Sequence, residues 1–152
     1  MWERGANTPA LVRLLCAYIA VGKQEVGQRL EGVLGVFQKL LASKATDASA
    51  CKLLSAIWRG FEHAEITQFL NPIFNLCLTR LQGNKKVAPH LVATWTVFIG
   101  RYGVQALHQQ LESIQPGLLS MLLNGYTSPC PRPKPRTPMP RTPMPRTPMP
   151  RT

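Results

Sequence analysis

The sequence predicts an all-α fold: a HEAT-type α-solenoid of about three antiparallel helix pairs, followed by a disordered Pro/Arg-rich tail. Three observations predict it. Apolar residues recur at helical spacing through the first 125 residues, the pattern repeats at an offset of 40 residues, and the composition changes abruptly after Tyr126. We therefore divide the chain into a HEAT-repeat solenoid domain, residues 1–125, and a low-complexity tail, residues 126–152.

Seven apolar stripes mark the predicted helices. They cover residues 11–19, 26–41, 54–61, 66–81, 91–102, 107–114 and 118–122. Thr8 is expected to cap the first helix ahead of Pro9, and Asp47 is expected to cap the third. Glycines are placed where four of the helices should end: Gly22, Gly60, Gly83 and Gly103.

The internal repeat decides between two all-α architectures. At an offset of 40 residues, Leu34 corresponds to Phe74, and Tyr18 corresponds to Trp58 and then Phe98. A two-helix unit of about 40 residues is the period of HEAT repeats, which stack because each pair alone has too little surface to bury. An ordinary antiparallel bundle with chance self-similarity is the alternative. The solenoid is favoured because one offset aligns two different helices. Four aromatic residues are expected in its core because they lie in the apolar stripes: Tyr18, Trp58, Trp95 and Phe98.

The residues that carry chemistry show no catalytic or metal-binding pattern. His63, His90 and His108 have no second ligand at metal spacing, so surface or helix-end positions explain them better. The four cysteines match no zinc or disulfide spacing, and no glycine-rich phosphate loop occurs. We predict a non-enzymatic protein with no catalytic residue, cofactor or metal.

Two short motifs have structural explanations that outweigh functional ones. Gly32 and Gly35 form a GxxG element like that of some RNA-binding domains, but it lies inside an amphipathic stripe, so close helix packing is the expected reason. Glu62 and Glu65 are expected in the first turn of a helix, where negative charge complements the helix dipole.

Positive charge suggests where partners could bind. The net charge is +11, but the tail carries six of the eighteen basic residues and no acid, so twelve basic and seven acidic residues leave +5 before residue 129. Lys44, Lys85 and Lys86 follow the ends of helices in consecutive repeats, and they could form a basic ridge. Solvated helix ends are the alternative, since lysine also complements the dipole there.

The tail is expected to lack stable structure. Ten of the fourteen prolines lie between Pro129 and Pro150, and a five-residue unit, Arg-Thr-Pro-Met-Pro, repeats from Arg136. Proline removes the amide donor and fixes φ, which prevents helix and sheet and favours polyproline II. Before the tail, the longest stretch without charged residues is fourteen residues, too short to span a bilayer.

Longer stretches of the sequence resemble a known family. Residues 2–15 (WERGANTPALVRLL), residues 30–47 (LEGVLGVFQKLLASKATD) and residues 97–122 are similar to the C-terminal region of CAS (cellular apoptosis susceptibility) exportins, in the importin-β superfamily. Residues 73–86 are similar but looser, and residues 60–71 depart most. The resemblance implies a HEAT-repeat piece from the C-terminal third of a much larger nuclear transport receptor.

The resemblance also implies partners and a location. Such receptors bind importin-α together with Ran-GTP, return importin-α to the cytoplasm, and shuttle between nucleus and cytoplasm through the nuclear envelope. The expected role is a protein-binding scaffold, without a small-molecule substrate or membrane insertion. Two alternatives stay open: a basic nucleic-acid-binding helical protein, whose affinity would fall steeply with salt, and a truncated non-functional copy.

Overall fold

The computed structural model describes residues 7–126, which form helices and contain no strand. The predicted tail and the domain boundary at 125/126 therefore stay predictions. The α-helices, and one short 3₁₀ helix, η2, are these: α1 (Thr8–Val21), α2 (Lys23–Gly27), α3 (Leu30–Leu41), α4 (Asp47–Gly60), α5 (His63–Gly83), η2 (Lys85–Val87), α6 (Ala88–Tyr102), α7 (Val104–Ile114) and α8 (Leu118–Tyr126).

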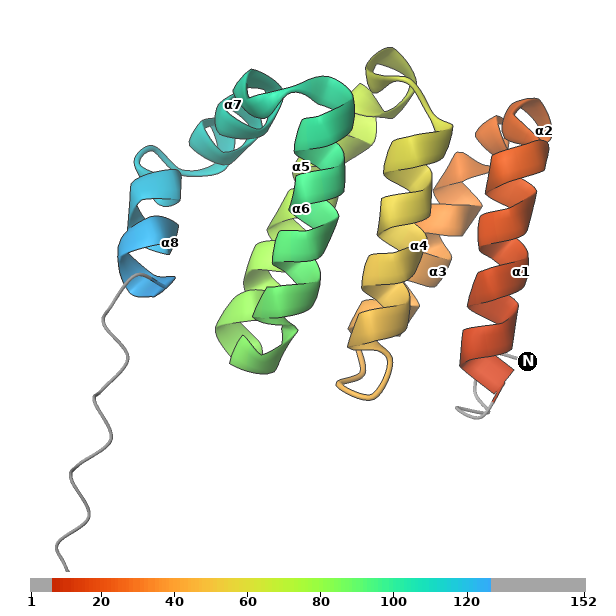
Figure 1. Ribbon diagram of the computed structural model, residues 1–152, viewed down its shortest axis with the longest axis horizontal. Coiled ribbons are helices and arrows are strands. Elements are labelled where there is room, and N and C mark those ends of the chain that lie inside the picture. The colour runs from red at the N-terminus through yellow and green to blue at the C-terminus, as the bar shows by residue number, and fades with distance from the viewer. Residues whose placement is uncertain (1–6, 127–152) are drawn as a thin grey trace, which may run out of the picture.

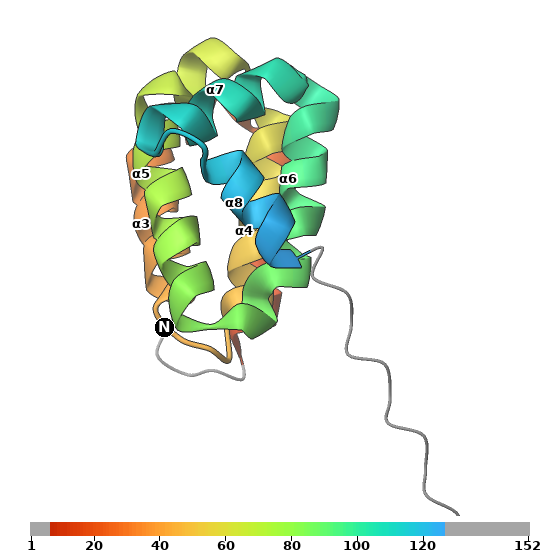
Figure 2. The ribbon, with the colours of Figure 1, turned by 90° about the vertical axis from the view of Figure 1, so that its left-hand side faces the viewer.

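The helices form two layers, one behind the other in Figure 1, and within each layer the helices lie side by side. In one layer α1 packs on α4 and α4 packs on α6, while in the other α3 packs on α5 and α5 packs on α7. Figure 2 shows the two layers from the end of the stack, with α8 crossing between them. Successive pairs, α1/α3, α4/α5 and α6/α7, thus follow one another along the stack, with α7 lying across its top in Figure 2, and this arrangement confirms the predicted HEAT-type solenoid.

The seven predicted stripes lie in helices, except that Phe61 is the C-cap after the end of α4, and one stripe is divided. Residues 26–41 were expected as a single helix, whereas the chain turns at Gln28 and Arg29 between α2 and α3. The helix ends predicted from glycine are confirmed to within one residue. Gly22 and Gly103 are the C-caps of α1 and α6, and Gly103 has the positive φ of 89° that favours glycine.

The two predicted N-caps are wrong by one position. Helix α1 already includes Thr8 and is preceded by Asn7, and α4 already includes Asp47 and is preceded by Thr46. Asp47 does not cap its own helix because its carboxylate is engaged by another element, described below. The expectation for Glu62 and Glu65 is confirmed in a specific form, since the two residues make the reciprocal hydrogen bonds of a capping box at the start of α5.

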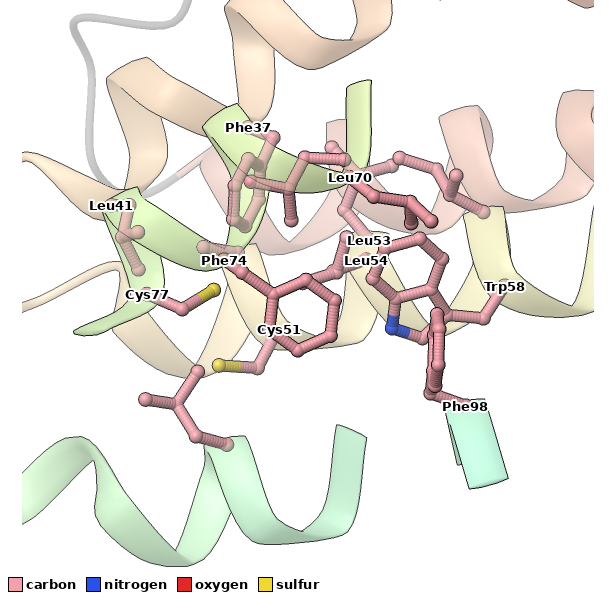
Figure 3. Packing of buried hydrophobic residues seen from close by; sticks show 14 of the residues in the cluster. Phe37, Leu41, Cys51, Leu53, Leu54, Trp58, Leu70, Phe74, Cys77 and Phe98 are labelled. Carbon is pink, nitrogen blue, oxygen red and sulfur yellow. The ribbon is translucent and has the colours of Figure 1, made fainter. Parts of the chain in front are cut away.

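The core contains a cluster of aromatic residues around Trp58, which Figure 3 shows among the buried side chains and next to Phe98. Its indole contacts Phe74 of α5 in a stacked arrangement, with ring centroids 6.3 Å apart, and Phe98 of α6 edge-on at 5.1 Å. These rings join both layers and two consecutive repeats. Trp58 and Phe98 are fully buried, as predicted, and Trp95 is partly buried against the same cluster.

The predicted core position of Tyr18 is wrong. Its side chain is 60% exposed, whereas Ile19 is 1% exposed and packs on α4. The burial patterns of α1 and α4 agree at an offset of 39 residues, which pairs Val12 with Cys51 and Ile19 with Trp58. One residue of shift turns a helix by about 100°, so Tyr18 leaves the core. The offset of 40 holds for Leu34 and Phe74, both of which pack against the core.

Glycine contributes to the stack at one position and not at two others. A Cβ on Gly60 would lie 2.5 Å from the Cγ2 of Ile19, so the absence of a side chain allows α1 and α4 to approach. At Gly32 and Gly35 a Cβ would meet nothing within 4 Å, and both residues face solvent. The expectation that close packing explains this GxxG pair is therefore wrong.

Candidate partner-binding edge

Lys44, Lys85 and Lys86 lie at one edge of the solenoid. Lys44 is in the connection between α3 and α4, and the other two lysines are in η2 between α5 and α6. Because α3 and α5 run in the same direction, both connections reach the lower edge in Figure 1. All three side chains are exposed. We call these three residues the lysine edge.

A buried ion pair holds the two connections together. Arg80, in the last turn of α5, donates from Nε to Oδ1 of Asp47 at 2.8 Å and from Nη2 to Oδ2 at 3.1 Å. The Asp47 side chain is 5% exposed and the Arg80 side chain 15%. Two parallel hydrogen bonds in a dry site fix the relative position of α4 and α5.

Asn84 extends this pair to the lysines. Its Nδ2 donates to Oδ2 of Asp47 at 2.8 Å, while its Oδ1 accepts from the backbone N–H of Lys86 at 3.3 Å. On the other connection, the Thr46 hydroxyl donates to the backbone carbonyls of Leu40 and Ser43. The backbone on both sides of the lysine edge is thus anchored by side-chain hydrogen bonds.

Among residues 7–126, the acidic residues leave the lysine edge uncompensated. The nearest acid, Asp47, is 4% exposed and is already bonded to Arg80 and Asn84. Four other acids belong to elements at the opposite edge: Glu25, Glu31, Glu62 and Glu65. One of them, Glu62, pairs with Arg101 there. A negatively charged partner would therefore be drawn to the lysine edge.

The remaining candidates from the sequence are not brought together. His90 and His108 are exposed on α6 and α7, and His63 begins α5 with its ring against Tyr102, 5.4 Å between centroids. In residues 7–126 no group of three potential metal ligands occurs. None of the helices in this part of the chain is long and apolar enough to cross a membrane.

Sequence reasoning missed the residues that organise the edge. Asp47 was expected only as a helix cap, and neither Arg80 nor Asn84 was singled out. The partners lie 33 and 37 residues from Asp47. Their one detectable signal is the repeat itself, which places the end of α5 beside the start of α4.

Comparison with known proteins decides the family. The family model described as "CAS/CSE protein, C-terminus" matches residues 1–131. The chain belongs to the CAS/CSE family. Among curated CAS/CSE relatives, Exportin-2 of Danio rerio is 38% identical over 137 residues, and human Exportin-2 is 37% identical over 131 residues. These matches cover 85% and 81% of this chain.

The family resemblance noted in the sequence is confirmed, and it concerns a small part of each relative. The chain spans 14% of the length of the Danio rerio protein and 13% of the human protein. No solved structure matches the chain. CAS/CSE membership identifies a transport-receptor family rather than an enzyme family, and the helical stack suits a protein-binding role.

Proposed function

We propose that this chain is part of a nuclear export receptor that returns importin-α to the cytoplasm together with Ran-GTP. It would act there as a protein-binding scaffold that shuttles between nucleus and cytoplasm. The observation that carries the proposal is the match of residues 1–131 to the C-terminal region of the CAS/CSE family. The stack of three helix pairs supports it, since such stacks offer extended surfaces to protein partners.

Physically, the receptor role needs coupling between two partners and no bond chemistry. A solenoid bends through small rotations between repeats, so two partners that stabilise the same curvature raise each other's affinity. The joints of this stack are packed interfaces, such as α4 on α6 and α5 on α7. We place the contact with importin-α or Ran-GTP on the lysine edge, Lys44, Lys85 and Lys86.

The test uses a chimaeric receptor. Residues 1–125 replace the matching segment of human Exportin-2, and the receptor is incubated with importin-α and Ran loaded with GTP. We expect a ternary complex in a pull-down, and loss of the complex when Ran carries GDP. The receptor without the segment is the negative control, and unaltered Exportin-2 is the positive control. A chimaera that folds but behaves like the segment-less control would refute the proposal.

A further inference from the structure

A surface groove begins beside the lysine edge and crosses the layer of α1, α4 and α6. Its volume is about 530 Å³. Ala48 in the first turn of α4 and His90 in the first turn of α6 lie at the end next to the lysine edge, and Arg59 lies towards the other end. The groove is lined by Cys16, Ala48, Cys51, Lys52, Ser55, Ala56, Arg59, His90, Ala93 and Thr94.

The lining has small side chains and positive charge but no acid. Alanine, serine and cysteine leave the space open, and Lys52 and Arg59 are exposed cations at its sides. Burial raises the pKa of the Cys51 thiol to about 11, although a hydrogen bond with Thr94 opposes this. The thiol is therefore neutral at physiological pH. The permanent charges of the groove come from Lys52 and Arg59 alone.

The dimensions suit an extended chain segment. Eleven residues separate Ala48 from Arg59 along α4, which corresponds to about 16 Å at 1.5 Å per residue. An extended peptide rises about 3.3 Å per residue, so about five residues cover the same length. A segment that continues past His90 also reaches the lysine edge, because His90 follows Lys86 by only four positions.

We propose that this groove, together with the lysine edge, binds an extended acidic peptide segment of a partner protein. The inference rests on the proposed scaffold function and defines the partner's chemistry. Carboxylates of the segment pair with Lys85, Lys86 and Lys52, and its small or apolar side chains occupy the space above Ala56 and Ala93. The hydrogen bond from the backbone N–H of Lys86 to Asn84 fixes the backbone that carries this lysine, so binding has to order only its side chain.

The lining favours a peptide over single-stranded nucleic acid. Proteins that bind single strands combine positive charge with aromatic side chains on which bases stack. The groove has no aromatic residue among those that line it, and Trp58 and Phe98 are fully buried beneath this layer. Alanine and cysteine provide contacts for small side chains but no stacking platform.

The test measures binding by fluorescence anisotropy with the full 152-residue chain at physiological salt. The probe is a labelled twelve-residue peptide of alternating glutamate and alanine. A glutamine–alanine peptide and a twelve-nucleotide oligothymidine are the comparison ligands. One double variant, Lys85→Glu with Lys86→Glu, is matched by Lys23→Glu with Arg29→Glu at the opposite edge, because both pairs change the net charge equally. Ala93→Trp fills the groove at an exposed position.

We expect the acidic peptide to bind about tenfold more weakly after reversal at Lys85 and Lys86, and less than about twofold more weakly after reversal at Lys23 and Arg29. Ala93→Trp should weaken binding of the acidic peptide about fivefold and leave the affinity for the oligonucleotide unchanged. Equal losses in the two double variants, or an unchanged affinity in Ala93→Trp, would overturn the inference. The inference would also be overturned if the oligonucleotide binds more tightly than the peptide and its binding is abolished by Ala93→Trp. Circular dichroism melts confirm that each variant is folded.

The outcomes are separable from the fate of the proposed function. If the chimaeric receptor forms the importin-α complex but the 152-residue chain does not bind the acidic peptide, only the groove inference is overturned. If the chain binds the peptide as described but the chimaeric receptor forms no complex, the proposed function is overturned and the groove remains a peptide-binding site.

Discussion

Removal of the Asp47 carboxylate gives the most direct test of how the lysine edge is held. In Asp47→Ala, Arg80 keeps its charge in a site where its side chain is only 15% exposed, and Asn84 loses the acceptor of its Nδ2. Breaking a buried pair by deleting one partner costs about 3–5 kcal/mol, because an uncompensated charge is left behind. The chain loses three hydrogen bonds to one carboxylate, which places the expected cost in that range.

The assay is urea denaturation followed by circular dichroism, with thermal melts as a second measure. For a folded region of this size, each kcal/mol corresponds to about 3–5 °C in Tm, so a cost of about 3–5 kcal/mol predicts a decrease of about 9–25 °C. The protein has its own control in Glu62 and Arg101, whose side chains are 70% and 40% exposed. Glu62 also caps α5, so Arg101→Ala is the cleaner control, and it should cost less than about 1 kcal/mol.

A double-mutant cycle isolates the pair itself. Asp47→Ala, Arg80→Ala and the double variant should give a coupling energy of about 2–3 kcal/mol, since the partners share one network. Replacement of both residues by apolar ones of similar size, Asp47→Leu with Arg80→Met, should be far less harmful than Asp47→Ala. The reasoning is refuted if Asp47→Ala costs no more than Arg101→Ala, or if the coupling energy is below about 1 kcal/mol.

Three further results are expected. Gly60→Ala should destabilise by about 1–3 kcal/mol in urea melts, because the new methyl group clashes with the α1 isoleucine, whereas Gly35→Ala, with open space around it, should be neutral or stabilising by up to about 1 kcal/mol. The Tyr102 hydroxyl donates to the backbone carbonyls of Trp58 and Phe61 at the end of α4, so Tyr102→Phe should cost about 1–2 kcal/mol. Burial raises the pKa of Tyr102 to about 12. The contribution of the hydroxyl is present below pH 10, the ordinary pKa, and is lost as pH rises towards 12, so variant and parent should converge in alkaline melts. Burial also raises the pKa of the Cys51 and Cys77 thiols, and peptide mapping after brief alkylation at pH 8 should find both unmodified until urea is added; rapid labelling in the folded chain would contradict the packing.

The repeat was predictable from sequence because it depends on patterns that a helix must show. Leu34 and Phe74 occupy corresponding positions because helical periodicity and stacking both constrain them. Register was the weak point. Tyr18 matches Trp58 in residue type at an offset of 40, but the connection through α2 shifts the first helix by one residue. Residue similarity at one position cannot detect a shift that burial of the whole helix reveals.

The candidate edge was only partly predictable, for a different physical reason. Lys44, Lys85 and Lys86 were found because charged residues at helix ends lie in exposed connections. The carboxylate between them was assigned to a local role because capping is an interaction of neighbours in sequence. Whether Asp47 caps its own helix or binds Arg80 is decided by the packing of α5 against the start of α4. The same holds for the groove, whose walls come from three separate helices.

The position of the lysine edge bears on how a ligand bound there would act on the shape of the stack. Asp47 begins α4, Arg80 lies in the last turn of α5, and Asn84 leads into η2 and α6, so one buried cluster ties the start of the α4/α5 repeat to its end at the lysine edge. A ligand that bridges Lys44 and Lys86 would contact the connection that enters the α4/α5 repeat and the connection that leaves it, so it would contact the links to both neighbouring repeats. Such a ligand favours the curvature at which both contacts are made. In a longer receptor, another partner that prefers the same curvature would gain affinity.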